Sequence, residues 1–265
     1  EPAHYTAYTA LALICAAALF PLTLTRLAQP ATRAAAALRP GLAWSRSPLA
    51  AAGVLVAALS GASFRMVGPV YGAGVGLDAG QIALFLAAFV AGGAVAQVPV
   101  GWLADRFDRR AVLIWTSVAA ILSCAFIALA QGLTTQGVMA TAALFGLTTF
   151  PVFSISAAHA HDFASSEERV ELSAALMFWF AVGAIAAPLV ASVLIGRFGP
   201  PALFVMIGAG HAALIVFGAA RMRVRPPAAL RTPYVYAPRT SFGVGALMAR
   251  FRDRDGRGDG RGGEN

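Results

Sequence analysis

The sequence contains no lysine, few charged residues of any kind and only two cysteines. Arginine supplies all 20 basic residues, and charged residues make up 12% of the chain, compared with about 25% in soluble domains. The missing lysine excludes a retinal protein, because the retinal Schiff base requires that side chain. Cys15 and Cys124 both lie within apolar runs, where small packed side chains are expected rather than a disulfide.

Apolar residues dominate what is present, at 58% of the chain, and this composition predicts a membrane protein. The net charge of +8 does not indicate a nucleic-acid partner, because the arginines fall in short loops and a tail rather than on one basic face. The sequence shows no metal-ligand spacing, nucleophile motif, phosphate loop or carboxylate pair. We therefore expect no metal, no cofactor and no enzyme activity.

Seven apolar runs have the length of about 20 residues that a membrane-spanning helix needs. Backbone polar groups in lipid must bond within their own segment, so these runs predict an all-α transmembrane fold with seven spans. The runs are Tyr5–Thr25, Pro48–Tyr71, Gln81–Ala104, Ala111–Ala130, Gly137–Ala158, Leu172–Ile195 and Ala202–Ala220.

The distribution of loop arginines predicts the orientation of the chain. Arginine-bearing loops alternate with the segments 72–80 and 131–136, which contain none. Cytoplasmic loops carry the excess of arginine, so we expect the amino terminus outside and the carboxyl terminus in the cytoplasm.

The same pattern predicts four regions. They are a transmembrane helix in residues 1–26, a basic cytoplasmic linker in 27–47, a six-helix bundle in 48–225, and a cytoplasmic, largely disordered tail in 226–265. The tail ends in a mixture of arginine, aspartate and glycine that cannot form a core. The chain begins with Glu1 and has no signal-peptide pattern, so we expect it to be the later part of a longer protein.

A charged hairpin at residues 101–110, Gly-Trp-Leu-Ala-Asp-Arg-Phe-Asp-Arg-Arg, separates two of these spans. Its charges are too costly to bury in lipid, so the hairpin must lie at a membrane face. A carboxylate at Asp105 could cap a helix amino terminus, which stabilises an exposed helix by roughly 0.3–1 kcal/mol.

The hairpin resembles the Gly-x-x-x-Asp-Arg-x-Gly-Arg-Arg loop of the major facilitator superfamily. The matching residues are Gly101, Asp105, Arg106, Arg109 and Arg110, with Asp108 in place of the second glycine. The resemblance implies helix six, the central loop and helices seven to twelve of a permease whose first half is a partner. It also implies that these residues form a conformational gate, in which Asp105 docks onto the other half. The alternative is a solvated turn.

Residues 158–162, Ala-His-Ala-His-Asp, together with Gly183, Pro188 and Pro-Val-Tyr at 69–71, are similar to YcaD-type bacterial permeases. This resemblance implies a protein of the bacterial inner membrane but names no substrate.

His159 and Asp162 are candidate partners of the gate. Asp162 ends the fifth span on the same face as the hairpin, where it could pair with Arg106 or Arg109 through a guanidinium–carboxylate contact. His159 lies three residues earlier, and a histidine titrates near neutral pH, so proton coupling stays open. The alternative is an ordinary polar helix end.

Arg65 and Gln97 are the candidate residues of a substrate cavity. Arg65 is the only charge well inside a span, and such a charge needs a cavity or a partner unless it reaches the surface. Gln97 could bind a solute or a neighbouring helix.

Small residues in the sixth span predict close helix packing. Gly183, Ala187 and Ala191 recur at four-residue spacing, and Pro188 lies among them. The resemblance places this helix at the interface that rocks between halves, and the alternative is plain packing.

Two functions follow from these patterns. One is part of a secondary-active transporter in the lipid bilayer, which moves a small solute by alternating access. The other is a seven-span receptor or scaffold without transport activity.

Overall fold

The computed structural model describes residues 3–23, 38–129 and 132–224, and the rest of the chain lies outside the described residues. Residues 1–37 and residues 38–265 form two separate units. The first unit contains α1 (Ala3–Thr23). The second contains α2 (Gly41–Arg46), α3 (Pro48–Gly74), α4 (Ala79–Arg106), α5 (Arg109–Leu129), α6 (Thr135–Thr149), α7 (Pro151–His161), α8 (Arg169–Phe198) and α9 (Ala202–Val224).

The prediction of an all-α transmembrane fold is confirmed. Six segments of the second unit are long and apolar enough to cross a membrane, with α6 and α7 together forming one of them. The first predicted span is also a helix, although its described apolar part, Tyr5–Phe20, is shorter than a full span. The fifth predicted span is not one regular helix, because it is divided at Pro151.

Local sequence signals explain where these helices begin. The Ser47 side chain accepts a hydrogen bond from the backbone N–H of Ala50, and Pro48 occupies the first turn of α3, where its missing N–H is tolerated. Asp78 and Gln81 form a reciprocal capping box at the start of α4. These caps fix the positions at which α3 and α4 enter the bundle.

The predicted linker, residues 27–47, contains structure that the sequence analysis did not anticipate. Its last part folds as the short helix α2, which contacts α3 and α8. The stretch 27–37 and the predicted tail after Arg225 lie outside the described residues.

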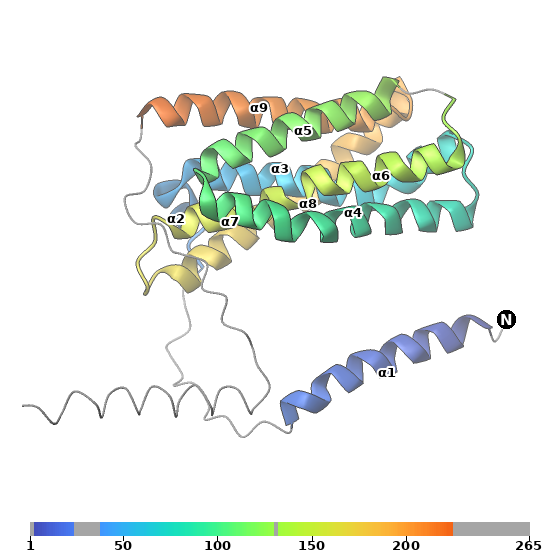
Figure 1. The fold of residues 1–265 in the computed structure, drawn as a ribbon, viewed down its shortest axis with the longest axis horizontal. Coiled ribbons are helices and arrows are strands. Elements are labelled where there is room, and N and C mark those ends of the chain that lie inside the picture. Colours follow the sequence, from blue (N-terminus) through green and yellow to red (C-terminus); the bar gives the residue numbers. More distant parts are fainter. Residues whose placement is uncertain (1–2, 24–37, 130–131, 225–265) are drawn as a thin grey trace, which may run out of the picture. The chain divides into compact units, whose positions relative to one another are not determined.

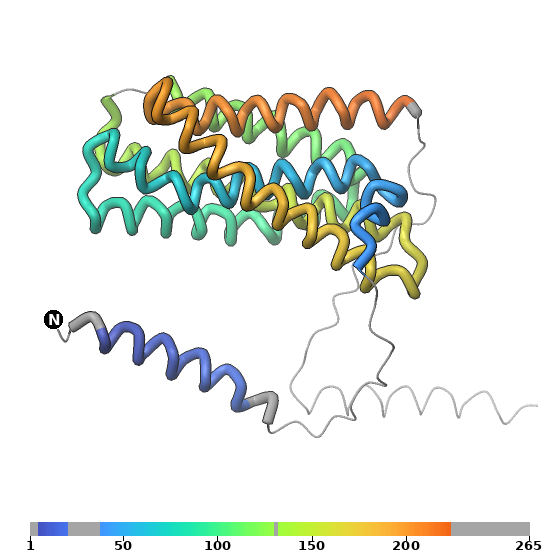
Figure 2. The backbone as a smooth tube through the Cα atoms, turned by 180° about the vertical axis from the view of Figure 1, so that it is seen from behind, coloured from blue at the N-terminus to red at the C-terminus, as the bar shows by residue number. Residues whose placement is uncertain are grey.

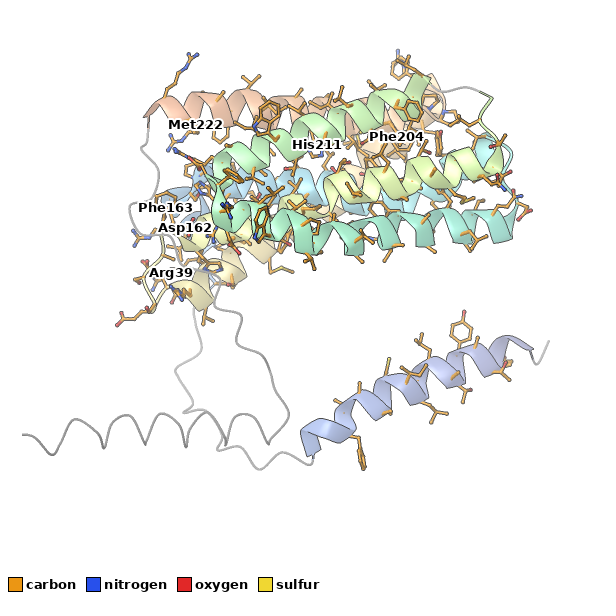
Figure 3. All side chains as sticks on the ribbon, viewed as in Figure 1. Arg39, Asp162, Phe163, Phe204, His211 and Met222 are labelled. Carbon is orange, nitrogen blue, oxygen red and sulfur yellow. The ribbon has the colours of Figure 1, made fainter. Side chains whose placement is uncertain are left out.

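The helices of the second unit run along one another as a bundle (Figures 1 and 2). The most extensive contacts join α4 to α6, α3 to α8 and α5 to α9. We call the end that carries α2, the α4–α5 turn and segment 162–168 the loop end, and the opposite end, with turn 75–78 and segment 199–201, the far end. Asp162 and Phe163 lie at the loop end, and Phe204 lies towards the far end (Figure 3).

An aromatic cluster fills the far half of the bundle, and we define it as Phe64, Phe85, Phe89, Phe145 and Phe204. All five side chains are fully buried. The Phe64 ring centroid lies 4.9 Å from that of Phe85 and 5.0 Å from that of Phe145, within the range of favourable ring contacts. The cluster joins α3, α4, α6 and α9.

The helices α4 and α6 approach each other so closely that their glycines are required. A Cβ atom added at Gly92 would lie 1.9 Å from the Ala143 carbonyl oxygen, and one added at Gly146 would lie 1.9 Å from the Phe89 carbonyl oxygen. Small residues allow helix backbones to touch in this way.

Candidate functional site

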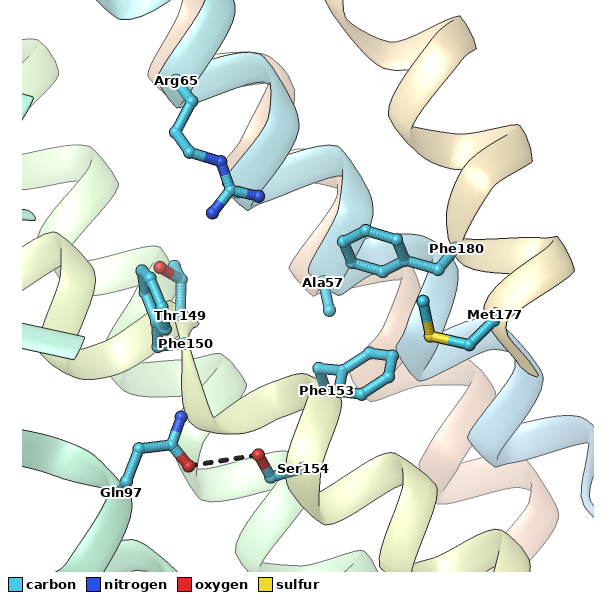
Figure 4. Close-up of a pocket in the computed structure, with 10 residues that line it drawn as sticks. Ala57, Arg65, Gln97, Thr149, Phe150, Phe153, Ser154, Met177 and Phe180 are labelled. Atoms are coloured by element: carbon cyan, nitrogen blue, oxygen red, sulfur yellow. Dashed lines mark hydrogen bonds between the residues drawn. The ribbon is translucent and has the colours of Figure 1, made fainter. Parts of the chain in front are cut away.

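A cavity of about 260 Å³ lies between the helices of the bundle (Figure 4). Residues from α3, α4, α6, α7 and α8, and Phe150 at the break between α6 and α7, form its wall. They are Ala57, Gly61, Arg65, Gln97, Thr149, Phe150, Phe153, Ser154, Met177 and Phe180. The structure thus places Arg65 and Gln97, which were singled out from the sequence, on the wall of one cavity.

The break between α6 and α7 shapes this wall. Pro151 has no N–H, so the carbonyl of Leu147 cannot receive its regular helical hydrogen bond. Thr149 and Phe150 precede the proline, Phe153 and Ser154 follow it, and all four line the cavity. These four residues were not predicted from the sequence, although a proline inside an apolar span is the signal that could have identified them.

Arg65 directs its guanidinium towards the middle of the bundle. Side chains on a helix tilt towards its amino end, which for α3 is the loop end at Pro48. An added Cβ at Gly61, one turn earlier, would lie 3.4 Å from Arg65 Nη2. The side chain therefore extends over Gly61 and away from the nearer, far-end surface, which argues against the alternative that it reaches that surface.

Gln97 makes an interhelical contact and also faces the cavity. The Ser154 hydroxyl donates a 3.1 Å hydrogen bond to Gln97 Oε1, which leaves the amide NH₂ of Gln97 as a donor towards the cavity (Figure 4). The two readings proposed from the sequence, helix contact and cavity residue, are therefore compatible.

The rest of the wall is apolar and largely aromatic. The rings of Phe153 and Phe180 meet edge to face with centroids 5.4 Å apart, and Met177 lies beside them (Figure 4). This part of the cavity offers an apolar surface built from two perpendicular rings and a thioether side chain.

A buried ionic cluster occupies the loop end. Arg109 Nη1 donates to Asp162 Oδ1 at 2.5 Å and to the Ala158 carbonyl at 3.0 Å. Arg109 Nη2 donates to Asp105 Oδ1 at 3.0 Å. The side chains of Arg109 and Asp162 are only 7% and 4% exposed. We call Arg109, Asp105 and Asp162 the loop-end cluster, and it ties α4, α5 and α7 together.

The capping carboxylate of the hairpin is Asp108 rather than Asp105. Asp105 belongs to the last turn of α4, the carboxyl end, where it cannot cap a helix amino terminus. Asp108 accepts a 3.0 Å hydrogen bond from the backbone N–H of Arg110, and its carbonyl accepts from Val112 at the start of α5. Its carboxylate also binds the Arg110 guanidinium at 2.7 Å. An aspartate therefore performs a capping function where the family motif has glycine.

The other predicted gate residues lie around the cluster rather than in it. Arg106 lies over the Trp102 ring, 5.4 Å from its centroid, and Gly101 has open space around it. His159 is buried, and its ring meets Phe163 edge to face at 5.2 Å. It lines a small side cavity with Arg110 rather than the central cavity. Of the two predicted gate partners, Asp162 pairs with Arg109 in the loop-end cluster, and His159 borders the side cavity.

A clamp between α2 and α8 was not foreseen from the sequence. Trp179 Nε1 donates a 2.9 Å hydrogen bond to the Pro40 carbonyl, and its ring meets that of Trp44 at 5.7 Å. Arg46, at the end of α2, pairs with Glu168. The hydrogen bond from Arg46 holds the pKa of Glu168 below its ordinary value. Trp44 in α2 and Trp179 in α8 were the sequence features from which this contact could have been predicted.

Gly183, Ala187, Pro188 and Ala191 lie buried in α8, which packs extensively along α3. A Cβ added at Gly183 would lie 2.9 Å from the Ala58 Cβ and 3.2 Å from the Leu55 carbonyl oxygen. Gly183 therefore permits close packing within this bundle.

His211 provides a further interhelical contact between α9 and α3. It is fully buried, and its Nε2 lies 3.0 Å from the Ser60 hydroxyl. Among the described residues there is no group of three or more histidine, cysteine, aspartate or glutamate side chains that could hold a metal ion.

Comparison with known proteins identifies the family that this arrangement resembles. A family model described as the Major Facilitator Superfamily matches residues 50–244. An uncharacterised MFS-type transporter of Yersinia pestis is 28% identical over 166 residues, which cover 63% of this chain and 41% of that protein. The uncharacterised MFS-type transporter YcaD of Salmonella heidelberg is 27% identical over 194 residues, which cover 72% of this chain and 49% of that protein.

Two solved structures share the fold. A structure described as an auto-inhibited POT family peptide transporter has a TM-score of 0.56 at 19% identity, covering 78% of this chain and 45% of that one. The POT family transporter PepTSo has a TM-score of 0.57 at 17% identity, covering 82% and 46%. The chain therefore spans less than half the length of each of these proteins, and the matches confirm the resemblance found in the sequence.

Proposed function

This chain belongs to the major facilitator superfamily, and from that membership we propose that its six-span bundle is one half of a secondary-active transporter. The transporter moves a small solute across a bacterial inner membrane by alternating access. The observation that carries this proposal is the cavity, which receives side chains from four of the six spans.

The second half of the transporter would be another six-helix bundle. The relatives named above are about twice as long as the matched region, which supports a two-bundle assembly around a shared cavity. In this proposal the cavity of about 260 Å³ is the contribution of one bundle, and the amino terminus lies outside and the carboxyl terminus in the cytoplasm.

The loop-end cluster would then position the gate. Arg109 holds one carboxylate oxygen of Asp105, and the Asp105 side chain is 32% exposed. A carboxylate that is oriented on one side and accessible on the other can dock onto a second bundle and leave it again. Removing Asp105 should therefore favour the state that is open at the loop end.

In this proposal, proton coupling would act at the loop-end gate and not at the central cavity. His159 borders Arg110 in the small side cavity, and it is absent from the wall of the central cavity. Protonation of His159 would therefore act on closure of the loop end rather than on the solute itself.

Cysteine accessibility tests alternating access without knowledge of the solute. Ser154→Cys is placed in full-length protein from which the native cysteines have been removed, and membrane-impermeant maleimide is applied from either side. Alternating access predicts labelling from both sides. Leu122→Cys is the control, because Leu122 is 65% exposed on an apolar helix and is expected to face lipid.

The rival function, a receptor or scaffold, predicts a different labelling pattern. Without an alternating path, Ser154→Cys would be labelled from one side at most. The family membership favours the transporter, and such one-sided labelling would refute alternating access.

A further inference from the structure

We propose that the central cavity binds an organic anion with an apolar body, such as an aromatic carboxylate. This inference rests on the proposed function for the cavity's role, and it adds the chemical class of the solute. It is carried by four observations: the depth and direction of Arg65, the lack of an acidic side chain around the cavity, the apolar character of most of its wall, and the donor that Gln97 adds.

The first observation is the depth and direction of Arg65. Its Cα lies nine residues before the end of α3, roughly 14 Å along the helix axis. The guanidinium extends further inwards, over Gly61. A cation at that depth requires a partner or a polar cavity, and Arg65 borders the cavity (Figure 4).

The second observation is the absence of a matching acid on this bundle. Among the described residues Arg65 has no ion pair or hydrogen bond, and none of the ten residues that line the cavity is acidic. Arg65 would repel an organic cation in this cavity, whereas it would form an ion pair with an anion. Guanidinium groups bind carboxylates through two parallel hydrogen bonds.

The third observation is that most of the cavity wall is apolar. Phe150, Phe153, Phe180 and Met177 contribute the apolar part. A small inorganic anion would leave that wall uncovered, and a sugar would find few hydrogen-bonding groups on it. An aromatic or acyl body would bury it and gain dispersion and ring contacts.

Gln97 adds a donor on the other side of the cavity. Because Ser154 donates to the Gln97 carbonyl oxygen, the amide NH₂ is directed to the cavity, and it can donate to an anion that Arg65 already holds. The two groups therefore offer donors from two sides, and an anion accepts these hydrogen bonds more strongly than a neutral solute does.

Equilibrium binding to the full-length protein in lipid nanodiscs tests this proposal with four probes. Phenylacetate, phenethyl alcohol and phenethylamine share one apolar body and differ in charge, and acetate carries the charge without the body. We expect phenylacetate to bind about tenfold or more tightly than each of the other three. Equal binding of the amine or the alcohol, or no binding of phenylacetate, would overturn the proposal.

Variants of the protein then test which residues give the selectivity for phenylacetate. Arg65→Gln should weaken phenylacetate binding by about tenfold to a hundredfold and leave phenethyl alcohol unchanged, and Arg65→Lys should restore part of the loss. Gly61→Leu should also weaken phenylacetate binding, because its side chain displaces the guanidinium without removing the charge; since Gly61 lines the cavity, phenethyl alcohol should bind more weakly as well. Arg197→Gln, in the last turn of α8, is the matched control and should bind phenylacetate as the parent does.

Two results separate this inference from the proposed function. If Arg65→Gln weakens all probes equally, Arg65 is the partner of an acid on the second bundle, and the anion inference is wrong even if transport occurs. If phenylacetate binds selectively but Ser154→Cys is labelled from one side only, the anion site stands and alternating access fails.

Discussion

At the loop end Arg109 joins α4, α5 and α7 through two carboxylates and a carbonyl, whereas in the far half the aromatic cluster joins α3, α4, α6 and α9 through ring contacts alone. The ionic contacts depend on exact partners and on local water, so they can be broken and re-formed at modest displacement. Ring packing does not depend on single pairs of atoms. Many weak dispersion contacts add up over the buried area, and all of them must be lost before the helices separate. We therefore expect the far half to move as a rigid body and the loop end to respond to its surroundings.

The largest expected effect tests the rigid half. Gly146→Val should lower the free energy of unfolding by about 5 kcal/mol or more, in the exceptional range for one substitution. Its Cβ would collide with the Phe89 carbonyl oxygen and separate α4 from α6. Unfolding in mixed detergent micelles measures this. Gly196→Ala is the control, because nothing lies within 4 Å of a Cβ at Gly196. If both variants are equally stable, the close helix contact does not hold the far half together.

The next effect tests the loop-end cluster. Arg109→Met should destabilise the bundle by about 3–5 kcal/mol, because it leaves the buried Asp162 carboxylate without its main partner. The double variant Arg109→Met with Asp162→Leu should recover most of that loss, since it removes both charges. A double-mutant cycle in micelles measures the coupling. Additive losses in the cycle would show that the pair is not coupled and would weaken the contrast between the two ends.

The smallest effect concerns the clamp between α2 and α8. Arg46 lowers the pKa of Glu168 below its ordinary 4.5, so the ionised carboxylate is favoured in the folded state. The contribution of this pair is present above pH 4.5 and is lost as the pH falls through the lowered pKa. The protection of the α2 amides, relative to their intrinsic exchange rate at each pH, should therefore fall at acid pH in the parent. In Glu168→Gln this protection should be lower at neutral pH and should vary less with pH, and an unchanged profile would contradict the role of this pair.

Some features of the site were within reach of the sequence. The charged hairpin could be placed at a membrane face because lipid cannot hold its charges, and Arg65 could be recognised as a candidate cavity residue because it interrupts an apolar span. Other features were not within reach. Asp105 and Asp108 are both carboxylates close to a helix boundary, and only the helix ends show that Asp108 is the cap and Asp105 the partner of Arg109.

The sequence by itself determined the class of this protein. Apolar runs of membrane length, separated by loops that alternate in charge, specify spanning helices, because each segment must satisfy its own backbone in lipid. The residues of the hairpin indicated the superfamily. These properties are local, so they can be read along the chain without knowing which helix touches which.

Tertiary structure decided which residues form the site. The wall of the cavity contains Gly61, Gln97, Phe153 and Phe180, which lie far apart in the chain. Residues on both sides of the helix break at Pro151 also form part of this wall. Whether the Arg65 side chain reaches a surface or the cavity depends on the space that Gly61 leaves for it and on the helices that form the rest of the cavity wall. Such outcomes depend on helix packing, which is set by the fit of side chains from several segments at once.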